Sequence, residues 1–412
     1  MGRDKLHDNR KLGSPDWTLI GGIILIVAGY ILLHDLIGGT LLEHNIWDSY
    51  TLQALAWRRG EFALGQNYTW LELAVFNGDY YVSFPPVPSL VLLPFTFYFG
   101  EETPNNFIIM IVTILSVVFC YLCFKRNACK SGTAMFWAVF FVLGSNMLWM
   151  STMGAVWFMA QALNLLFCIA AVYCIVIGWR GLSLALIALA VGCRPFSIFL
   201  LFAAFACFCL WEVKTGKQRP VISILRQCRY LIAPAAIGAV YLWYNYARFG
   251  NMLEFGHNYL PEFTGAGNNQ FSMRYLPQNL ARYFLNPVAI DKDGRLSFAA
   301  YDGFMFFIAN PIFLVWFIRI GIDIYKKRFT TSKAIVCVAL AANMLALLMH
   351  KSLGGWQFGA RYTVDLIPCV LFYFMIDGRN RVGRLWLFIG AFAFMFNLYG
   401  ALVMNFKPGY ML

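Results

Sequence analysis

Residues 153–178 read MGAVWFMAQALNLLFCIAAVYCIVIG, a run without a single charged side chain. A helix rises about 1.5 Å per residue, so this run is long enough to cross the roughly 30 Å apolar core of a bilayer. Similar runs recur along the chain, in which 60% of the residues are hydrophobic and 13% are charged. Soluble domains carry about 25% charged residues. The sequence therefore predicts an all-α polytopic membrane protein.

The lengths of the apolar runs predict about eleven membrane spans. They lie near residues 17–38, 84–99, 105–124, 133–150, 153–178, 181–211, 229–247, 301–320, 333–350, 361–377 and 384–405. Lys and Arg gather in short loops between the spans, so we interpret the net charge of +12 as an orientation signal rather than a nucleic-acid surface. The most basic loops, which we expect on the cytoplasmic side with the N-terminus, are 3–11, 214–229, 319–333 and 379–384.

This orientation leaves three loops on the outer side of the membrane. They are 39–83, 248–300 and 351–360. Lys125, Arg126 and Lys130 would also lie outside, which conflicts with the rule that basic loops are cytoplasmic. Either this violation is tolerated, or one of the spans between residues 84 and 178 is not a full crossing. We expect residues 1–412 to form a single transmembrane domain.

Carboxylates are concentrated in the outer loops rather than inside the spans. They are Glu43, Asp48, Glu61, Glu72, Asp79, Glu254, Glu262, Asp291 and Asp293. A channel or carrier usually keeps its polar groups inside the helix bundle. This distribution instead favours chemistry at the outer membrane surface.

The first outer loop contains an amphipathic segment from Asp48 to Arg59. Leu52 and Leu55 recur at helical spacing against Arg58, which predicts a short helix in the membrane interface. An acid at the start of such a helix is stabilised by the helix dipole. Asp48 is therefore either a simple helix cap or a reactive group.

Further along the same loop the chain reads GDYYVSFPPVP over residues 78–88. An acid near the end of the first span, followed by this entry into the second, resembles the first extracytoplasmic loop of the GT-C superfamily of polyprenyl-phosphate-sugar glycosyltransferases. The likeness is greatest to the bacterial branch related to protein mannosyltransferases and lipid A aminoarabinose transferases. Further matches follow in the order of that branch at residues 156–161, 194–195, 244–250, 253–257 and 354–362, and then at Asp365 and Pro368.

The resemblance implies a GT-C type fold with juxtamembrane helices in the first outer loop. It also implies a polyprenyl-phosphate-linked sugar as donor, and a general base in that loop that takes the proton of an acceptor hydroxyl, with inversion at the anomeric carbon. Asp48 matches that base. A carboxylate can accept this proton, and partial burial raises its pKa toward the working pH. Glycan, lipid and protein hydroxyls all fit as acceptors.

The leaving lipid phosphate develops negative charge and needs cationic groups near the outer surface. Arg361 is our first candidate, because a guanidinium binds phosphate in bidentate fashion and because it lies in the most family-like segment. Lys351, Arg274 and Arg282 are the other candidates. For Arg361 and Lys351 the alternative role is an interfacial anchor.

The chain departs from better-known branches at two places. Several relatives have a Lys just before the two prolines and use it on the donor phosphate, whereas this chain has Ser83-Phe84. The paired Asp-Glu of the protein mannosyltransferases is Asp48-Ser49 here. The first difference means that another residue must bind the phosphate, and the second weakens the case for a protein acceptor.

Other side chains of the outer loops are candidates for binding the substrates. They are Tyr50, Glu72, Asp79, Tyr81, Glu254, His257, Trp356 and Tyr362. The aromatic ones could stack on a sugar or a prenyl chain, although aromatic residues are common at any membrane interface. Arg194 lies in an apolar segment, where a charged group needs a partner, and Asp365 is the candidate partner. The alternative is that Arg194, next to a proline, lies near a cytoplasmic or cavity-facing end of its helix.

No cofactor is firmly implied. The five histidines form no HExxH or comparable ligand set, and no Gly-rich phosphate loop faces the cytoplasm, which disfavours a nucleotide-sugar donor. A divalent metal held by Asp48, Glu72 and Asp79 is compatible with the sequence. We expect a multi-pass protein of the bacterial plasma membrane with its active site on the outer face. Its expected partners are the lipid-linked donor, the acceptor and membrane lipids, and not nucleic acid.

Two other functions stay open. A transporter or flippase for lipid-linked sugars would place polar residues at mid-depth, where the spans have few apart from Arg194, Gln161, Asn146 and Asp365. A non-catalytic membrane protein that binds polyprenyl lipids would leave the acidic first loop and the segment around Arg361 without a role.

Overall fold

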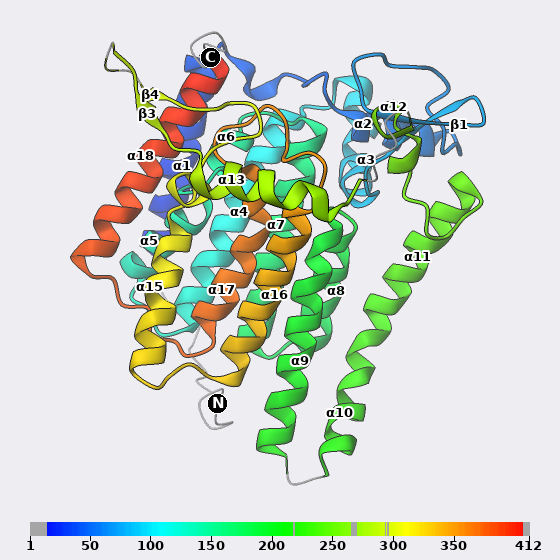
Figure 1. Ribbon diagram of the computed structural model, residues 1–412. Coiled ribbons are helices and arrows are strands. Elements are labelled where there is room, and N and C mark those ends of the chain that lie inside the picture. Colours follow the sequence, from blue (N-terminus) through cyan, green and yellow to red (C-terminus); the bar gives the residue numbers. More distant parts are fainter. Residues whose placement is uncertain (1–14, 217–218, 265–269, 293, 295, 407–412) are drawn as a thin grey trace.

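The computed structural model describes residues 15–216, 219–264, 270–292, 294 and 296–406. Its helices run between two ends of a bundle, and most of the irregular chain is gathered at one of them (Figure 1). We call this the loop end; it holds residues 37–86, 250–264 and 349–360. The opposite end is called the basic end. The strands of the described residues are short and lie in loops: β1 (Leu73–Phe76), β2 (Asp79–Val82), β3 (Ala289–Ile290) and β4 (Leu296–Ser297).

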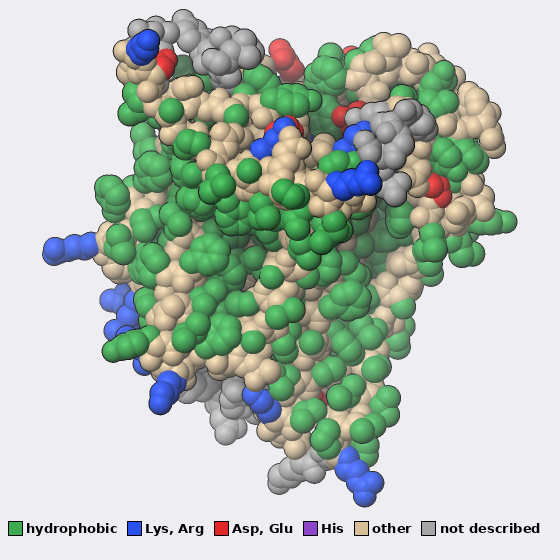
Figure 2. Space-filling model, in the orientation of Figure 1, with side chains coloured by type: hydrophobic (Ala, Val, Ile, Leu, Met, Phe, Trp, Pro, Cys, Tyr) green, Lys and Arg blue, Asp and Glu red, His purple; other side chains and the backbone are tan. Residues whose placement is uncertain are grey.

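Six helices of the described chain are long and apolar enough to cross a membrane. They are α1 (Trp17–Leu36), α4 (Asn105–Arg126), α7 (Val156–Ile177), α9 (Ile198–Thr215) with the turn before it, α16 (Thr331–Leu348) and α18 (Arg384–Phe406). Other helices accompany them: α5 (Ser131–Val142), α8 (Arg180–Val191), α11 (Ile232–Phe249), α15 (Ile312–Tyr325) and α17 (Ile367–Met375). Figure 2 shows hydrophobic side chains over the middle of one face and most Lys and Arg nearer its two ends. The prediction of an all-α polytopic membrane protein is confirmed.

The remaining helices are short or lie outside the main bundle. They are α2 (Ser49–Arg58), α3 (Val87–Phe99), α6 (Met147–Met150), α10 (Pro220–Cys228), α12 (Pro261–Thr264), α13 (Leu276–Leu285) and α14 (Phe306–Ala309). The helix predicted after Asp48 is present as α2. It packs against α3, and its first residues are buried.

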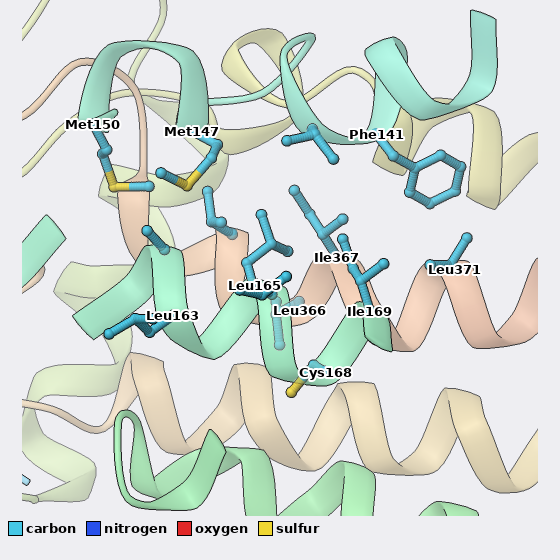
Figure 3. Packing of buried hydrophobic residues seen from close by; sticks show 14 of the residues in the cluster. Phe141, Met147, Met150, Leu163, Leu165, Cys168, Ile169, Leu366, Ile367 and Leu371 are labelled. Carbon is cyan, nitrogen blue, oxygen red and sulfur yellow. The ribbon is translucent and has the colours of Figure 1, made fainter. Parts of the chain in front are cut away.

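The centre of the bundle is formed by α7 and α17. Every residue of α17 is buried, and a helix that is hydrophobic on all sides is stable only when other helices surround it. Figure 3 shows Ile169 of α7 next to Ile367 of α17. By contrast, only 17% of the apolar window of α1 is buried, as expected of a helix that faces lipid.

The span predicted at 84–99 is wrong. The helix there, α3, begins at the loop end, where the Val87 amide donates to the carbonyl of Gly192 at 3.0 Å. The chain after α3 leads directly to Asn105, whose side chain contacts the first loop. Both ends of α3 therefore lie at the loop end. At about 20 Å for its 13 residues, α3 is too short to cross.

This correction removes the conflict with the orientation rule. Because α3 does not cross, α4 runs from the loop end to the basic end, and Lys125 lies 3.5 Å from Asp16 at the start of α1. The turn after α4 also contacts the end of α17, where Asn127 donates to the carbonyl of Met375. The basic turn at 125–130 therefore lies at the same end as the other basic loops.

The single span predicted at 181–211 is also wrong, because the structure divides it into two antiparallel helices. The start of α8 and the end of α9 are joined by an ion pair between Arg180 and Glu212 at 2.9 Å. The turn between the helices contains Arg194 in an extended conformation. Pro195 explains the break, since the residue before a proline is pushed out of the helical region. The turn places Arg194 at the loop end instead of inside a span.

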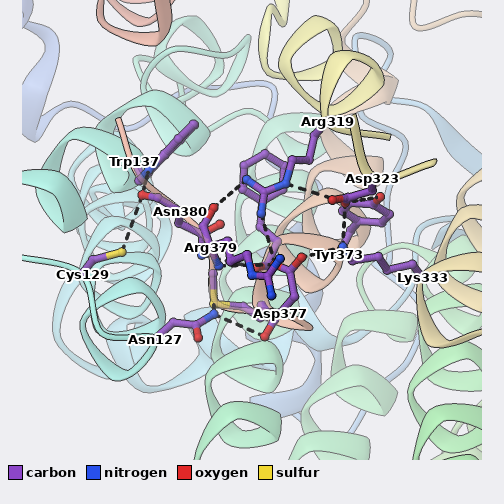
Figure 4. Close-up of polar contacts among 12 residues, drawn as sticks. Asn127, Cys129, Trp137, Arg319, Asp323, Lys333, Tyr373, Asp377, Arg379 and Asn380 are labelled. Atoms are coloured by element: carbon purple, nitrogen blue, oxygen red, sulfur yellow. Dashed lines mark hydrogen bonds and ion pairs between the residues drawn. The ribbon is translucent and has the colours of Figure 1, made fainter. Parts of the chain in front are cut away.

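A buried ionic network joins α15, α16 and the end of α17 near the basic end (Figure 4). The fully buried ammonium of Lys333 lies 2.6 Å from Asp323 and 2.7 Å from Asp377. Tyr373 donates to Asp323 at 2.8 Å, and Arg319 donates to Asp377 at 3.1 Å. The network contains two cations and two carboxylates, so each charge has a partner that replaces the solvation lipid cannot provide.

Replacing Lys333 by Met should lower the free energy of unfolding by about 3–5 kcal/mol, because it leaves the carboxylates of Asp323 and Asp377 with a single cation, Arg319, and one buried negative charge uncompensated. Chemical unfolding of the purified protein in detergent measures this. The matched control is Lys327→Met, at an exposed position of the same basic end, which should change stability by less than about 0.5 kcal/mol. Equal stability of the two variants would contradict the assigned role of the network.

Candidate active site

Asp48 is buried at the N-cap of α2 and accepts four hydrogen bonds. Its Oδ1 atom accepts from the backbone amides of Tyr50 at 2.9 Å and Thr51 at 3.2 Å. Its Oδ2 atom accepts from the hydroxyl of Thr51 at 2.5 Å and from the amide of Asn105 at 2.9 Å. The helix-cap role considered for Asp48 is therefore present. The four bonds hold its carboxylate in one orientation at the loop end.

Burial raises the pKa of Asp48 above its ordinary value. The hydrogen bonds from Thr51 and Asn105 and the nearby His44 act in the opposite direction, but they do not outweigh desolvation. The charged form of this carboxylate is thus less stable than it would be in water.

Arg361 begins a 3-10 helix (Arg361–Leu366) that leads into α17, and it is buried. Its Nε and Nη2 atoms donate to the carbonyl of Gly354 at 3.1 and 2.9 Å, and Nη1 donates to Gln161 at 2.8 Å. Within the described chain it forms no ion pair with a carboxylate. Since a guanidinium has five N–H groups, two remain for a ligand.

The predicted pairing of Arg194 with Asp365 is confirmed, at 2.8 Å. Asp365 also accepts long hydrogen bonds from Gln161 at 3.4 Å and Asn164 at 3.3 Å. The ring of Tyr362 lies 4.7 Å from the guanidinium of Arg194 and 4.7 Å from that of Arg361. Two cations and one carboxylate therefore surround one aromatic ring, which gives the cluster a net positive charge.

Two histidines lie beside this cationic cluster. His350 packs edge-on against Tyr362 at 6.2 Å between ring centres, and His257 packs against Phe84 at 5.9 Å. Burial, together with the charge of Arg194, lowers the pKa of both histidines to about 4. Both rings are neutral at pH 7, so they add no charge to the cluster.

Tyr50 is fully buried, two residues after Asp48. Its ring packs against Phe84 at 6.3 Å between centres, and its hydroxyl has no hydrogen-bond partner among the described residues. Because no part of the ring is exposed, Tyr50 does not offer an open surface for stacking on a sugar in this conformation.

Glu72 lies close to the same part of the loop end. It accepts a hydrogen bond from the indole of Trp157 at 3.2 Å, and the Trp157 ring lies 6.1 Å from that of Trp47, next to Asp48. Glu72 also lines a surface pocket of about 380 Å³ together with Leu260.

The other predicted substrate-binding residues are dispersed. Asp79 and Tyr81 line a separate pocket of about 350 Å³, and Glu254 accepts hydrogen bonds within its own loop from Gly256 and Asn258. Trp356 is 42% exposed and forms a β-bridge in another part of the loop end. The described residues contain no group of three or more His, Cys, Asp or Glu side chains that could hold a metal ion, so Asp48, Glu72 and Asp79 do not gather as considered above.

The residues predicted to bind the donor phosphate also lie in different places. Arg361 is in the cluster, whereas Lys351 lies 4.7 Å from the ring of Phe263. Arg274 is exposed, and Arg282 is paired with Asp302 at 2.5 Å. Arg361 and Arg194 are therefore the cations that the structure brings together beside Tyr362.

Two residues that position candidate site residues were not predicted from the sequence: Asn105, which holds Asp48, and Gln161, which holds Arg361. Asn105 is the first residue of α4, and no sequence pattern links it to Asp48. Gln161 had a signal, because it is a polar residue in an otherwise apolar span. Its amide donates to the carbonyl of Arg361 at 2.9 Å while its oxygen accepts from the guanidinium, so both ends of Gln161 fix the same residue.

The fold defines the class: a polytopic membrane protein with a GT-C type fold. The apo structure of the oligosaccharyltransferase from Archaeoglobus fulgidus is similar, with a TM-score of 0.52 and 13% identity over 94% of this chain and 55% of that one. Two further structures from that organism match with TM-scores of 0.48 and 0.49 and 12% identity, covering 94% and 95% of this chain and 56% and 55% of theirs. One is AglB with an inhibitory peptide and a dolichol-phosphate, and the other is the enzyme tethered to an acceptor peptide.

This chain thus spans little more than half the length of those structures. No protein-family model matches it, and no curated protein matches it. The GT-C resemblance found in the sequence is confirmed at the level of the fold.

Proposed function

We propose that this protein is a membrane glycosyltransferase that moves a sugar from a polyprenyl-phosphate donor to an acceptor hydroxyl. The main support is the combination of two features at the loop end of a GT-C type fold. One is the carboxylate of Asp48, and the other is the cluster of Arg194 and Arg361 with a net positive charge. A group-transfer reaction with an anionic leaving group needs both a base and a cation.

In this mechanism Oδ2 of Asp48 is the basic atom. Its two hydrogen-bond donors, Thr51 Oγ1 and Asn105 Nδ2, belong to side chains that can rotate away, whereas Oδ1 is held by backbone amides. The acceptor hydroxyl gives its proton to Oδ2 while its oxygen bonds to the anomeric carbon. The bond between that carbon and the phosphate oxygen breaks with its electron pair, and the configuration inverts.

The phosphate leaves as a more highly charged anion. The two unused N–H groups of Arg361 can bind it in bidentate fashion, and Arg194, which lies against the same Tyr362 ring, adds long-range attraction. No Lys is needed at position 83 or 84 in this arrangement. Lys351 keeps a secondary role at most, and Arg274 has none.

We further propose that the loop end faces the outside of a bacterial plasma membrane and the basic end the cytoplasm, according to the distribution of Lys and Arg. The described helices then act as one transmembrane unit. The acceptor is a hydroxyl of a glycan, a lipid or a protein that reaches the loop end from outside.

Replacing Arg361 by Gln should lower the rate of polyprenyl-phosphate release from a polyprenyl-phosphate sugar about a hundredfold to a thousandfold, as expected for loss of one group that stabilises developing charge. The assay uses purified protein in nanodiscs with a membrane extract as acceptor. The matched control is the exposed Arg274→Gln, which should keep full activity. A larger loss in the Arg274 variant than in the Arg361 variant would reverse the assignment of the phosphate partner.

A further inference from the structure

The hydroxyl of Tyr50 is a buried donor without an acceptor. Tyr50 lies in the first turn of α2, where Asp48 fixes its backbone amide at 2.9 Å. No surface of its side chain is exposed, and no described atom pairs with its Oη atom. Buried polar groups in folded proteins nearly always have a partner, because an unpaired one costs free energy. A Phe, of which the chain has 39, would fill the same space without that cost.

The surroundings of Tyr50 point to an anionic partner. Its ring contacts Phe84, and the segment that follows bonds to the α8–α9 turn through the Val87 amide and the carbonyl of Gly192 at 3.0 Å. That turn also holds Arg194, whose charge lowers the pKa of Tyr50, whereas the charge of Asp48 raises it, so both charged groups are close enough to act on this hydroxyl. Burial raises the pKa of Tyr50 well above its ordinary value, so the hydroxyl keeps its proton and serves as a donor.

We infer that the Tyr50 hydroxyl donates a hydrogen bond to the phosphate of the polyprenyl-phosphate donor, between the base Asp48 and the guanidinium of Arg194. This rests on the proposed function and adds a neutral donor to its phosphate subsite. A phosphate is the fitting ligand because a hydrogen bond to a charged oxygen is roughly twice as strong as one to a neutral oxygen. It also brings the negative charge that the unbalanced cluster lacks.

The phosphate reaches this hydroxyl only when the surrounding chain opens. Phe84 contacts both Tyr50 and His257, and it thereby connects the irregular segment 83–86 with the 3-10 turn His257–Tyr259, which the irregular segment 251–256 precedes. Movement of these segments relative to each other separates Phe84 from His257 and admits the ligand without unfolding α2 or the α8–α9 turn.

The test is Tyr50→Phe, with binding of farnesyl phosphate measured in detergent and farnesol as the uncharged probe. We expect the variant to bind farnesyl phosphate about tenfold more weakly or worse, with farnesol binding unchanged. The melting temperature of the ligand-free variant should be equal to or above that of the wild type, since only an unpaired group is removed.

The matched control is Tyr30→Phe. Tyr30 is also buried, but its hydroxyl is hydrogen-bonded to Ser151 at 2.5 Å. This variant should melt at a lower temperature and bind farnesyl phosphate like the wild type. Both substitutions remove a tyrosine hydroxyl. Only Tyr50→Phe should weaken the binding of farnesyl phosphate, and only Tyr30→Phe should lower the melting temperature.

Two outcomes would overturn this inference but leave the proposed function intact. One is that Tyr50→Phe binds farnesyl phosphate as tightly as the wild type. The other is that it melts lower with unchanged binding, which would mean that an internal water already completes the hydroxyl. If the wild type binds farnesyl phosphate no better than farnesol, the proposed function fails together with the inference.

Discussion

Replacing Asp48 by Asn should reduce glycosyl transfer by about a hundredfold to ten-thousandfold, the range expected for loss of a general base. The substitution is well suited to this site because Asn caps a helix about as well as Asp. The bonds from the amides of Tyr50 and Thr51 can therefore persist, and α2 should stay folded. Donor binding should be unchanged, because the phosphate contacts are assigned to other residues.

The measurement compares turnover and donor affinity of the two proteins, with Asp79→Asn as the control. Asp79 is exposed in the β1–β2 hairpin, so its substitution should leave turnover intact. Because the pKa of Asp48 is raised by burial, the rate of the wild type should fall as the pH drops through that raised pKa and the base becomes protonated. A wild-type rate that is flat down to pH 4, or full activity in Asp48→Asn, would show that another group is the base.

Replacing Asp365 by Asn should lower the free energy of unfolding by about 3–5 kcal/mol, because it leaves Arg194 and Arg361 both uncompensated around Tyr362. Thermal and chemical unfolding in detergent measure the loss. The control is Asp302→Asn, whose pair with the more exposed Arg282 should contribute less.

The double variant Arg194→Met/Asp365→Leu separates stability from function. Replacing a buried ion pair by apolar side chains of similar size is often neutral for stability. We therefore expect the double variant to regain most of the stability that Asp365→Asn loses. It should still bind the donor more weakly than the wild type, because it lacks the guanidinium of Arg194. If it recovers both, the pair has only a structural role.

Several features of the molecule could be predicted from the sequence because each follows from a local rule. Hydrophobic runs identify most of the bundle, and the capping preference of an acid identifies the start of α2. The pairing of Arg194 with Asp365 followed from the cost of an unpaired charge in an apolar segment. These predictions needed no knowledge of how the helices are arranged.

Other features depended on long-range packing. The α3 segment is as apolar as a span, and only its contacts with α2 and with Gly192 keep both of its ends at the loop end. The apolar run at 181–211 concealed a turn at Arg194-Pro195 whose single proline is equally compatible with a kink. The separation of Arg361 from Lys351, only ten residues earlier in the chain, is set by loops that have no periodic pattern.

The central claim is that this protein breaks the bond between a sugar and a polyprenyl phosphate. The most direct measurement reconstitutes the purified protein in liposomes with a polyprenyl-phosphate sugar, supplies a membrane extract as acceptor, and follows free polyprenyl phosphate over time. The account predicts release that requires the acceptor and is lost in Asp48→Asn. Movement of the intact lipid-linked sugar between leaflets, with no release in either protein, would contradict it and identify a flippase instead.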